Sequence, residues 1–159
     1  MQDQPILIIG STGKTGSRIV RSLKEKGFSV REGSRNSAIP FDWEQPETWT
    51  AALSGVTAAY VSYFPDLAFP GAADKIRALT VAATKAGVRK LVLLSGRGEA
   101  HAVACEEIVR NSGLAFTLIR AAWFAQNFSE GYLLPPVLEG VVALPAGDIK
   151  EPIVDVDDI

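Results

Sequence analysis

Short apolar runs alternate along the chain with segments that have the period of a helix. Residues 5–10 contain four consecutive large apolar side chains, a pattern typical of a strand that is covered on both faces. Further strands are predicted at residues 28–33, 58–63, 90–95 and 115–120, and a shorter one at 38–41. Amphipathic helices are predicted between them, at residues 15–26, 46–54, 72–86 and 99–111. This alternation predicts an α/β fold with a doubly wound parallel sheet, the Rossmann type of NAD(P)-binding domain.

The pattern changes after residue 120. Residues 123–134 are rich in aromatic side chains and irregular, 137–144 predict a helical turn and a strand, and 153–156 predict another strand. Asp157 and Asp158 then have the character of a helix N-cap, because aspartate accepts hydrogen bonds from the unpaired N–H groups of a first turn. We expect a single domain over residues 1–159, with no helix behind this cap.

The composition is that of an ordinary globular domain and narrows the classes of partner. The chain has 159 residues, 47% of them hydrophobic and 21% charged, and a net charge of -2 without a long run of either sign. This balance argues against a dedicated binder of nucleic acids or membrane surfaces. Only one cysteine is present, Cys105, which excludes an internal disulfide and favours a cytoplasmic location. We also expect no signal peptide and no metal site.

A glycine-rich turn joins the first predicted strand to the first predicted helix. Gly10, Gly13 and Gly16 have the spacing G-x-x-G-x-x-G. In a dinucleotide site the first glycine makes a tight turn, the second lets backbone N–H groups approach a pyrophosphate, and the third lets helix and strand pack closely. The N-terminus of the helix then attracts the anion. The residues predicted to bind the cofactor here are Gly10, Ser11, Thr12, Gly13, Lys14, Thr15 and Gly16.

The same turn contains a possible P-loop ending. Gly13, Lys14 and Thr15 match the last part of a Walker A motif, but that motif needs a glycine where Ile8 stands inside the predicted strand. No predicted strand ends in the acidic residue expected of a Walker B partner. We therefore prefer the dinucleotide interpretation.

The end of the second predicted strand bears on the choice between NADP and NAD. NAD sites carry an acidic residue there for the ribose 2′-hydroxyl, whereas NADP sites have a nearby arginine for the 2′-phosphate. Arg35 follows the strand, Ser34 offers a hydroxyl beside it, and Lys14 adds a second cation. Glu32 is the competing signal, since it has the charge to serve an NAD ribose. We favour NADP(H) and leave the NAD alternative open.

Several segments resemble a known family in their order and spacing. They are Gly10 to Gly16, Ser34-Arg35, Phe41-Asp42-Trp43, Leu93-Leu94-Ser95 and Trp123 to Phe128. Together they resemble the NmrA-like branch of the atypical short-chain dehydrogenase/reductases. Within that branch the chain looks most like the ergot-alkaloid reductases, the festuclavine and agroclavine dehydrogenases, and their bacterial relatives. The resemblance covers essentially the whole chain.

The resemblance implies a role for each of these segments. The glycine-rich turn would hold the pyrophosphate, and Arg35 the 2′-phosphate. Asp42 and Trp43 would lie near the adenine, and Tyr63 and Phe64 would line the nicotinamide ribose. Residues 123–128, with Trp123 and Phe124 as cofactor contacts, would border the nicotinamide and the substrate pocket. Ser95 is a further expected cofactor contact. Chains of this family continue beyond a segment like residues 152–159 into much of their substrate-binding region. We therefore expect a cofactor-binding half whose substrate pocket is open on one side.

The proton-donor pair of typical short-chain dehydrogenases is missing. Those enzymes use a Ser with a Tyr-x-x-x-Lys pair, in which the tyrosine transfers the proton and the lysine lowers its pKa. The serine is present as Ser95, but the pair's positions in the next helix hold His101 and Cys105. Histidine is a common proton donor in enzymes, so His101 is a candidate for that role, although a surface histidine is the simpler interpretation. Ser95 and His101 are the only catalytic candidates.

Three functions compete on this basis. The first is NADPH-dependent reduction of a small organic substrate such as an imine or enone, favoured by the aromatic stretch 123–132. The second is a non-catalytic NADP(H) sensor that acts through a protein partner, favoured by the missing Tyr-Lys pair. The third is a small-molecule binding module without redox chemistry. We expect no direct nucleic-acid or membrane partner, and leave a homo-oligomer or another protein partner open.

Overall fold

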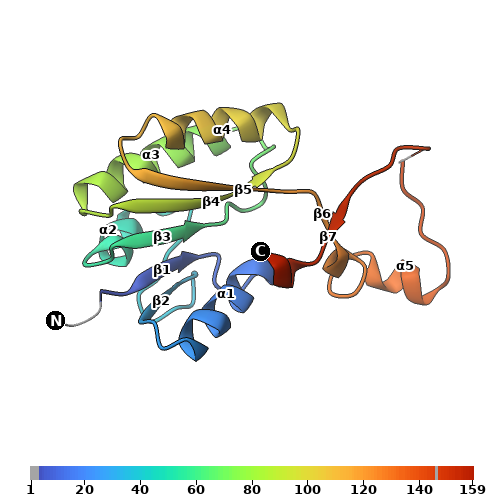
Figure 1. The fold of residues 1–159 in the computed structure, drawn as a ribbon, viewed down its shortest axis with the longest axis horizontal. Helices are drawn as coiled ribbons and strands as arrows, with labels where there is room; N and C mark the ends of the chain where they lie inside the picture. The colour runs from blue at the N-terminus through green and yellow to red at the C-terminus, as the bar shows by residue number, and fades with distance from the viewer. Residues whose placement is uncertain (1–3, 146) are drawn as a thin grey trace.

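A five-stranded parallel sheet forms the centre of the molecule (Figure 1). The computed structural model describes residues 4–145 and 147–159. The strands follow the order β2-β1-β3-β4-β5 across the sheet. Their bounds are β1 Ile6–Ile9, β2 Val30–Gly33, β3 Ala58–Val61, β4 Lys90–Gly96 and β5 Ala115–Ala121. The helices between them are α1 Lys14–Glu25, α2 Glu47–Leu53, α3 Ala72–Lys85 and α4 Ala100–Arg110. The predicted α/β, doubly wound parallel fold is confirmed.

Helices cover the two faces of this sheet, because alternate strand residues point to opposite sides. Leu7 and Ile9 of β1 belong to the larger apolar cluster, on the side of α2, α3 and α4. Ile8 points the other way and packs with Val20 of α1 and Tyr60 of β3. Figure 1 shows α3 and α4 on one side of the sheet and α1 on the other. Each of these fully buried aliphatic side chains stabilises the fold by about 1.5–3 kcal/mol relative to exposure.

Glycines with a positive φ angle follow the helices α1 and α3. Gly27 after α1 and Gly87 after α3 have φ angles of 80° and 82°, a conformation that costs other residues steric strain. The following residues donate hydrogen bonds back into the last helical turn, Phe28 N to Leu23 O at 2.9 Å and Val88 N to Ala83 O at 3.0 Å. Both chain reversals are therefore encoded locally.

The predicted strand at residues 38–41 is not formed. This segment instead turns, and the backbone N–H of Phe41 donates to the carbonyl of Ser34 at 3.0 Å. Pro40 has no N–H to donate to a ladder, and the ring of Phe41 is held by stacking on Trp49 at a centroid distance of 5.7 Å. Aromatic packing and a proline therefore override the short apolar pattern.

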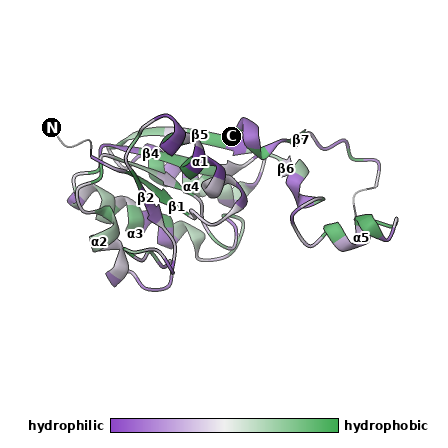
Figure 2. Cartoon of the chain, turned by 90° about the horizontal axis from the view of Figure 1, so that it is seen from below, coloured by the Kyte–Doolittle hydropathy of each residue, from purple (hydrophilic) through white to green (hydrophobic). Residues whose placement is uncertain are grey.

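The C-terminal segment forms a small second sheet and an extended arm. Its elements are β6 Trp123–Phe124, η1 Ala125–Asn127, α5 Leu134–Leu138, β7 Ile153–Val154 and η2 Val156–Asp158. Strands β6 and β7 pair in parallel, so the predicted strand at 153–156 is present but shorter. The predicted strand within 137–144 is not formed, and only the helical turn is found there. Figure 2 shows that the part carrying α5 projects from the sheet and is largely apolar.

The predicted cap at Asp157 is displaced by two residues. Asp155 is the N-cap of η2, and its side chain accepts a hydrogen bond from Asp157 N at 2.9 Å. The cap therefore has a short helical turn behind it. Arg18 of α1 binds Asp157 at 2.7 Å and Glu130 at 2.6 Å, and Val156 is buried, so this segment folds back onto α1. Within the described residues no helix has the length and apolar character needed to cross a membrane.

Candidate cofactor cleft

A cleft of about 1020 Å³ lies at the carboxyl edge of the central sheet. Residues at or just beyond the ends of successive strands line it, among them Gly10, Ser34, Tyr63, Ser95 and Trp123. The chain leaves β1 for β2 on one side and later returns to β3 on the other, so β1 marks the reversal of strand order. In open α/β sheets, ligands bind in the crevice at such a reversal.

The glycine-rich turn forms one end of this cleft and leaves no room for side chains. Gly10 has a φ angle of 81°, and Gly13 N donates to Gly10 O at 2.9 Å. A Cβ atom at Gly16 would lie 2.7 Å from the carbonyl carbon of Gly10, too close for any side chain. The tight turn and the close helix–strand approach expected from the sequence are therefore both present.

The N-terminus of α1 opens onto the cleft with its amides available. Gly13 is the N-cap and provides no side-chain acceptor, so the N–H groups of the first turn have no capping partner within the described structure. Gly13, Lys14 and Thr15 line the cleft. Such an arrangement of free N–H groups, the helix dipole and a lysine fits a phosphate group.

All of the predicted cofactor residues except Ser11 and Gly16 line this cleft. Gly16 packs beneath the turn, as its role requires. Ser11 is buried, and its hydroxyl has no hydrogen-bond partner among the described residues, which marks the turn as a place where a ligand or an ordered water would satisfy a polar atom. The side chain of Thr15 accepts a hydrogen bond from Tyr60 Oη at 2.9 Å and so holds α1 on the sheet.

The residues around the end of β2 differ in whether they line the cleft, which bears on the choice between NADP and NAD. Ser34 and Arg35 line the cleft, with the hydroxyl groups of Ser34 and Ser37 2.8 Å apart. Glu32 is not part of the lining, and its carboxylate binds Lys24 Nζ of α1 at 2.7 Å. The acidic residue that would serve an NAD ribose is therefore engaged elsewhere.

An aromatic group forms the wall next to the predicted adenine and ribose positions. Trp43 is buried, and its ring meets that of Tyr63 edge to face at a centroid distance of 4.9 Å. The carbonyl of Asp42 accepts from Trp49 Nε1 at 2.6 Å, and that of Trp43 from Lys75 Nζ at 2.8 Å. These hydrogen bonds to α2 and α3 fix the position of the wall. Burial, and then the nearby Glu44 carboxylate, raise the pKa of Tyr63.

Beyond this wall, Ser95 at the end of β4 is part of a buried polar network that sequence patterns do not reveal. Its hydroxyl lies 2.7 Å from the carboxylate of Glu106, a fully buried residue of α4. Arg120 of β5 donates to both carboxylate oxygens, with its shortest contact at 2.6 Å. Arg120 and Ser95 lower the pKa of Glu106. Because an ionised carboxylate only accepts hydrogen bonds, Ser95 is the donor, and its lone pairs remain for the cleft.

The two residues at the Tyr-Lys positions do not reach this site. His101 is exposed in the first turn of α4 and is not among the residues that line the cleft. Cys105 is fully buried in the core, where burial raises the pKa of its thiol. Of the two catalytic candidates, Ser95 therefore lies in the cleft and His101 outside it.

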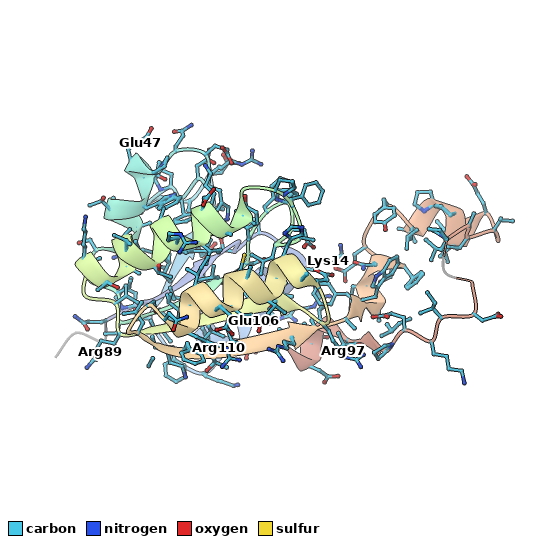
Figure 3. The ribbon with its side chains drawn as sticks, turned by 90° about the horizontal axis from the view of Figure 1, so that it is seen from above. Lys14, Glu47, Arg89, Arg97, Glu106 and Arg110 are labelled. Carbon is cyan, nitrogen blue, oxygen red and sulfur yellow. The ribbon has the colours of Figure 1, made fainter. Side chains whose placement is uncertain are left out.

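Charged side chains mark the two ends of the sheet. Figure 3 shows Lys14 and Arg97 at the end from which the C-terminal segment leaves, and Glu47 and Arg89 at the opposite end. Arg97 also lines the cleft, together with Asp66, Glu99 and Glu151. These residues lie in loops without a local sequence pattern, so the sequence gives no signal for them.

Comparisons with known proteins agree with the sequence resemblance. No protein-family model matches the chain. Prestalk A differentiation protein A of Dictyostelium discoideum is 29% identical over 160 residues, which cover 90% of this chain and 52% of that protein. Festuclavine dehydrogenase of Aspergillus fumigatus is 29% identical over 177 residues, covering 97% of this chain and 59% of the relative. The chain thus spans a little over half the length of these relatives.

Solved structures share the fold at lower identity. A nucleoside-diphosphate-sugar epimerase from Staphylococcus aureus superposes with a TM-score of 0.80 at 18% identity, covering 97% of this chain and 63% of the other. The Citrobacter triphenylmethane reductase complexed with NADP(H) gives a TM-score of 0.68 at 19% identity, covering 97% and 62%. The chain is therefore a Rossmann-fold homologue of the festuclavine and agroclavine dehydrogenases, as its sequence motifs predict.

Proposed function

We propose that the chain binds NADP(H) and takes part in the NADPH-dependent reduction of a small organic substrate, such as an imine or enone. The observation that carries this proposal is the continuous cleft from the glycine-rich turn to Trp123 and Phe124. Its residues fit a dinucleotide, with free amides and Lys14 at one end and aromatic side chains at the other. The names of the relatives support the same chemistry, because they include festuclavine dehydrogenase and an NAD(P)H azoreductase.

The preference for NADP(H) over NAD(H) rests on two residues. Arg35 lines the cleft just beyond β2, where a 2′-phosphate would lie. Glu32 is paired with Lys24 and is turned away from that position. A guanidinium contact with a phosphate is a charge-assisted hydrogen bond, of the stronger class in proteins. These contacts favour the phosphorylated cofactor.

The roles of the chain's own residues follow from their positions. The amides at the start of α1 would hold the pyrophosphate, and Arg35 would hold the 2′-phosphate. A bound NADPH supplies a hydride at its nicotinamide ring. Trp123, Phe124 and Tyr63 would limit water at that end of the cleft, while Ser95 presents only acceptor lone pairs. Proximity and orientation would supply most of the rate enhancement.

A sensor function is the second candidate. It is favoured by α4, which has an exposed His101 and a buried Cys105 where the typical enzymes have their Tyr-Lys pair. In this case the chain would bind NADP(H) and signal through a protein partner or a second copy, as NmrA-like regulators do. A cytoplasmic location, supported by the single buried thiol, belongs to both proposals.

Oxidation of NADPH in the presence of imines, enones and quinones separates the two candidates. We expect turnover with at least one of these classes, and a marked loss in Arg35→Ala. Arg21→Ala is the matched control, because Arg21 is exposed on α1 outside the cleft. Binding of NADPH without oxidation in the whole panel would favour the sensor. Failure to bind NADPH would contradict both.

A further inference from the structure

We propose that Glu99 is the proton donor for reduction in this cleft, in the role that the Tyr-Lys pair has in typical short-chain dehydrogenases. The inference rests on the proposed reductase function. It goes beyond that function, because hydride transfer by itself requires no acidic residue. Glu99 immediately precedes α4 and lines the cleft with Ser95 and Tyr63.

The carboxylate of Glu99 is turned toward the sheet rather than toward its own helix. Glu99 is the N-cap of α4, a position whose side chain commonly accepts a hydrogen bond from the first helical turn, yet it makes no such bond. It lies over Gly96 instead, where an added Cβ atom would be 2.6 Å from the carboxyl carbon of Glu99. The absence of a side chain at Gly96 therefore creates the space that this carboxylate fills.

The surroundings of Glu99 raise the pKa of its carboxyl group. The causes are a partial loss of hydration and then the negative charge of Asp66, from the loop after β3. The other charged groups that line the same cleft are Lys14, Arg35, Asp42, Glu44, Asp66, Arg97 from its own loop and Glu151 from the C-terminal segment. Within residues 4–145 and 147–159, the structure shows no hydrogen bond or ion pair that engages the carboxylate of Glu99. A carboxyl group in such a place keeps its proton to a higher pH than a solvated glutamate.

Ser95 and Tyr63, which line the same cleft, are poorer donors. Ser95 has committed its proton to Glu106. The pKa of Tyr63 is raised, because burial and the Glu44 carboxylate outweigh the opposing charge of Lys75, so its phenol is a weaker acid than usual. His101 and Cys105 do not line the cleft. Glu99 is thus better suited to donate a proton in the cleft than these four residues.

The proposed step balances for a neutral acceptor with a polar double bond. The acceptor would receive a hydride from the reduced nicotinamide, at carbon in an imine or enone and at one carbonyl oxygen in a quinone. The π electrons shift to a heteroatom, which is the second carbonyl oxygen in a quinone, and that atom takes the proton of Glu99. The nicotinamide is oxidised, the acceptor is reduced, and Glu99 is left as a carboxylate. Because Glu99 remains partly exposed, solvent can return its proton. A cationic acceptor needs only the hydride, since the electron pair neutralises its charge.

Because only a neutral acceptor needs a proton, a neutral and a cationic substrate can be compared as probes. Menadione is a neutral quinone that needs a hydride and a proton, whereas malachite green is a triarylmethyl cation that needs a hydride alone. In Glu99→Gln we expect kcat with menadione to fall on the order of 100-fold, the usual contribution of general acid catalysis. We expect malachite green reduction to change by less than about twofold. Glu107→Gln, on the exposed face of the same helix, should match wild type with both.

Two further measurements separate proton donation from a structural role. In Gly96→Ala the carboxylate is displaced with its charge unchanged, and menadione reduction should fall while malachite green reduction persists. In wild type the menadione rate should decline as pH rises through the pKa of Glu99, and this decline should be absent with malachite green. Carbon-13 NMR of glutamate side chains, without cofactor, should show one carboxyl with a raised pKa that is missing in Glu99→Gln.

Several results would overturn the proposal. One is menadione turnover in Glu99→Gln within about twofold of wild type, and another is an equal loss with both probes. Loss of menadione turnover in Tyr63→Phe alone would assign the proton to the tyrosine. If wild type binds NADPH but reduces neither probe, the reductase function fails. The NMR titration still tests Glu99 in that case, and an ordinary pKa there would contradict its placement.

Discussion

The hydrogen-bond network around Glu106 allows the stability of a variant to be predicted. Its carboxylate is fully buried, accepts from Ser95 at 2.7 Å and is bound by Arg120 through both oxygens. Glu106→Gln keeps the size of the side chain but removes the charge, so the amide group must face at least one of these donors with its own N–H. We expect the substitution to destabilise the fold without changing its architecture.

The magnitude follows from the exposure of the two partners. Removing one partner of a fully buried ion pair costs about 3–5 kcal/mol, but the side chain of Arg120 is 52% exposed and can be hydrated again. Hydrogen bonds to charged groups contribute about 1.5–3 kcal/mol. We therefore expect Glu106→Gln to lower the free energy of unfolding by about 2 kcal/mol. With a urea m-value of about 2 kcal/mol/M, the midpoint should fall by about 1 M.

The stabilisation by Glu106 should depend on pH in a definite direction. The pKa of Glu106 in the folded protein is lowered, chiefly by Arg120, relative to an unfolded value of about 4.3. Its stabilisation is therefore fully present above that unfolded value and is lost as pH falls through the folded pKa. The difference in the free energy of unfolding between wild type and Glu106→Gln should be constant near neutral pH and should become smaller in acid.

Urea unfolding followed by circular dichroism at neutral and acidic pH measures both quantities. Glu107→Gln is the control, because its carboxylate is exposed and contacts only Arg110 among the described side chains. If Glu106→Gln lowers the free energy of unfolding by less than about 0.5 kcal/mol, the range of ordinary surface substitutions, the buried network does not stabilise the fold as described. A difference in this free energy that stays constant in acid would also contradict the prediction.

Three other predictions test the turn, the thiol and the C-terminal segment. Gly16→Ala should abolish NADPH binding and lower stability, because its Cβ would collide with Gly10; normal binding by calorimetry would contradict the geometry of the turn. Cys105 should react slowly with iodoacetamide in the folded protein and rapidly in urea, since it is buried with a raised pKa; equal rates would show that it is accessible. Arg18→Ala should speed amide exchange at residues 153–159, which it anchors through Asp157, and unchanged exchange would rule out that anchoring role.

Local sequence patterns were sufficient to predict the strands and helices that form the layers of the fold. The run of apolar residues in β1 requires cover on both faces, and Gly27 and Gly87 require the left-handed conformation that ends a helix. These signals act within a few residues, so the strands and helices lie within about two residues of their predicted bounds. The error at residues 38–41 has the opposite cause, since the stacking of Phe41 on a distant Trp49 decides that conformation.

The candidate site was predictable where a motif specifies backbone geometry. The glycine-rich turn and Arg35 fall into this class, because their positions depend on a strand, a turn and a helix in sequence. Glu99 and Glu106 could not be selected, because their environments are made by residues from other elements, Asp66 for the one and Arg120 for the other. A carboxylate on a helix predicts exposure unless its partner is known.

The proposed NADP(H) site can be tested by calorimetry of NADPH and NADH binding to the purified chain. We expect wild type to bind NADPH more tightly, by about 10- to 150-fold if Arg35 contributes a charge-assisted contact to the 2′-phosphate. Arg35→Ala should lose that preference, and Arg21→Ala should keep it. Equal affinities in wild type, or a preference that survives in Arg35→Ala, would show that Arg35 does not bind a 2′-phosphate.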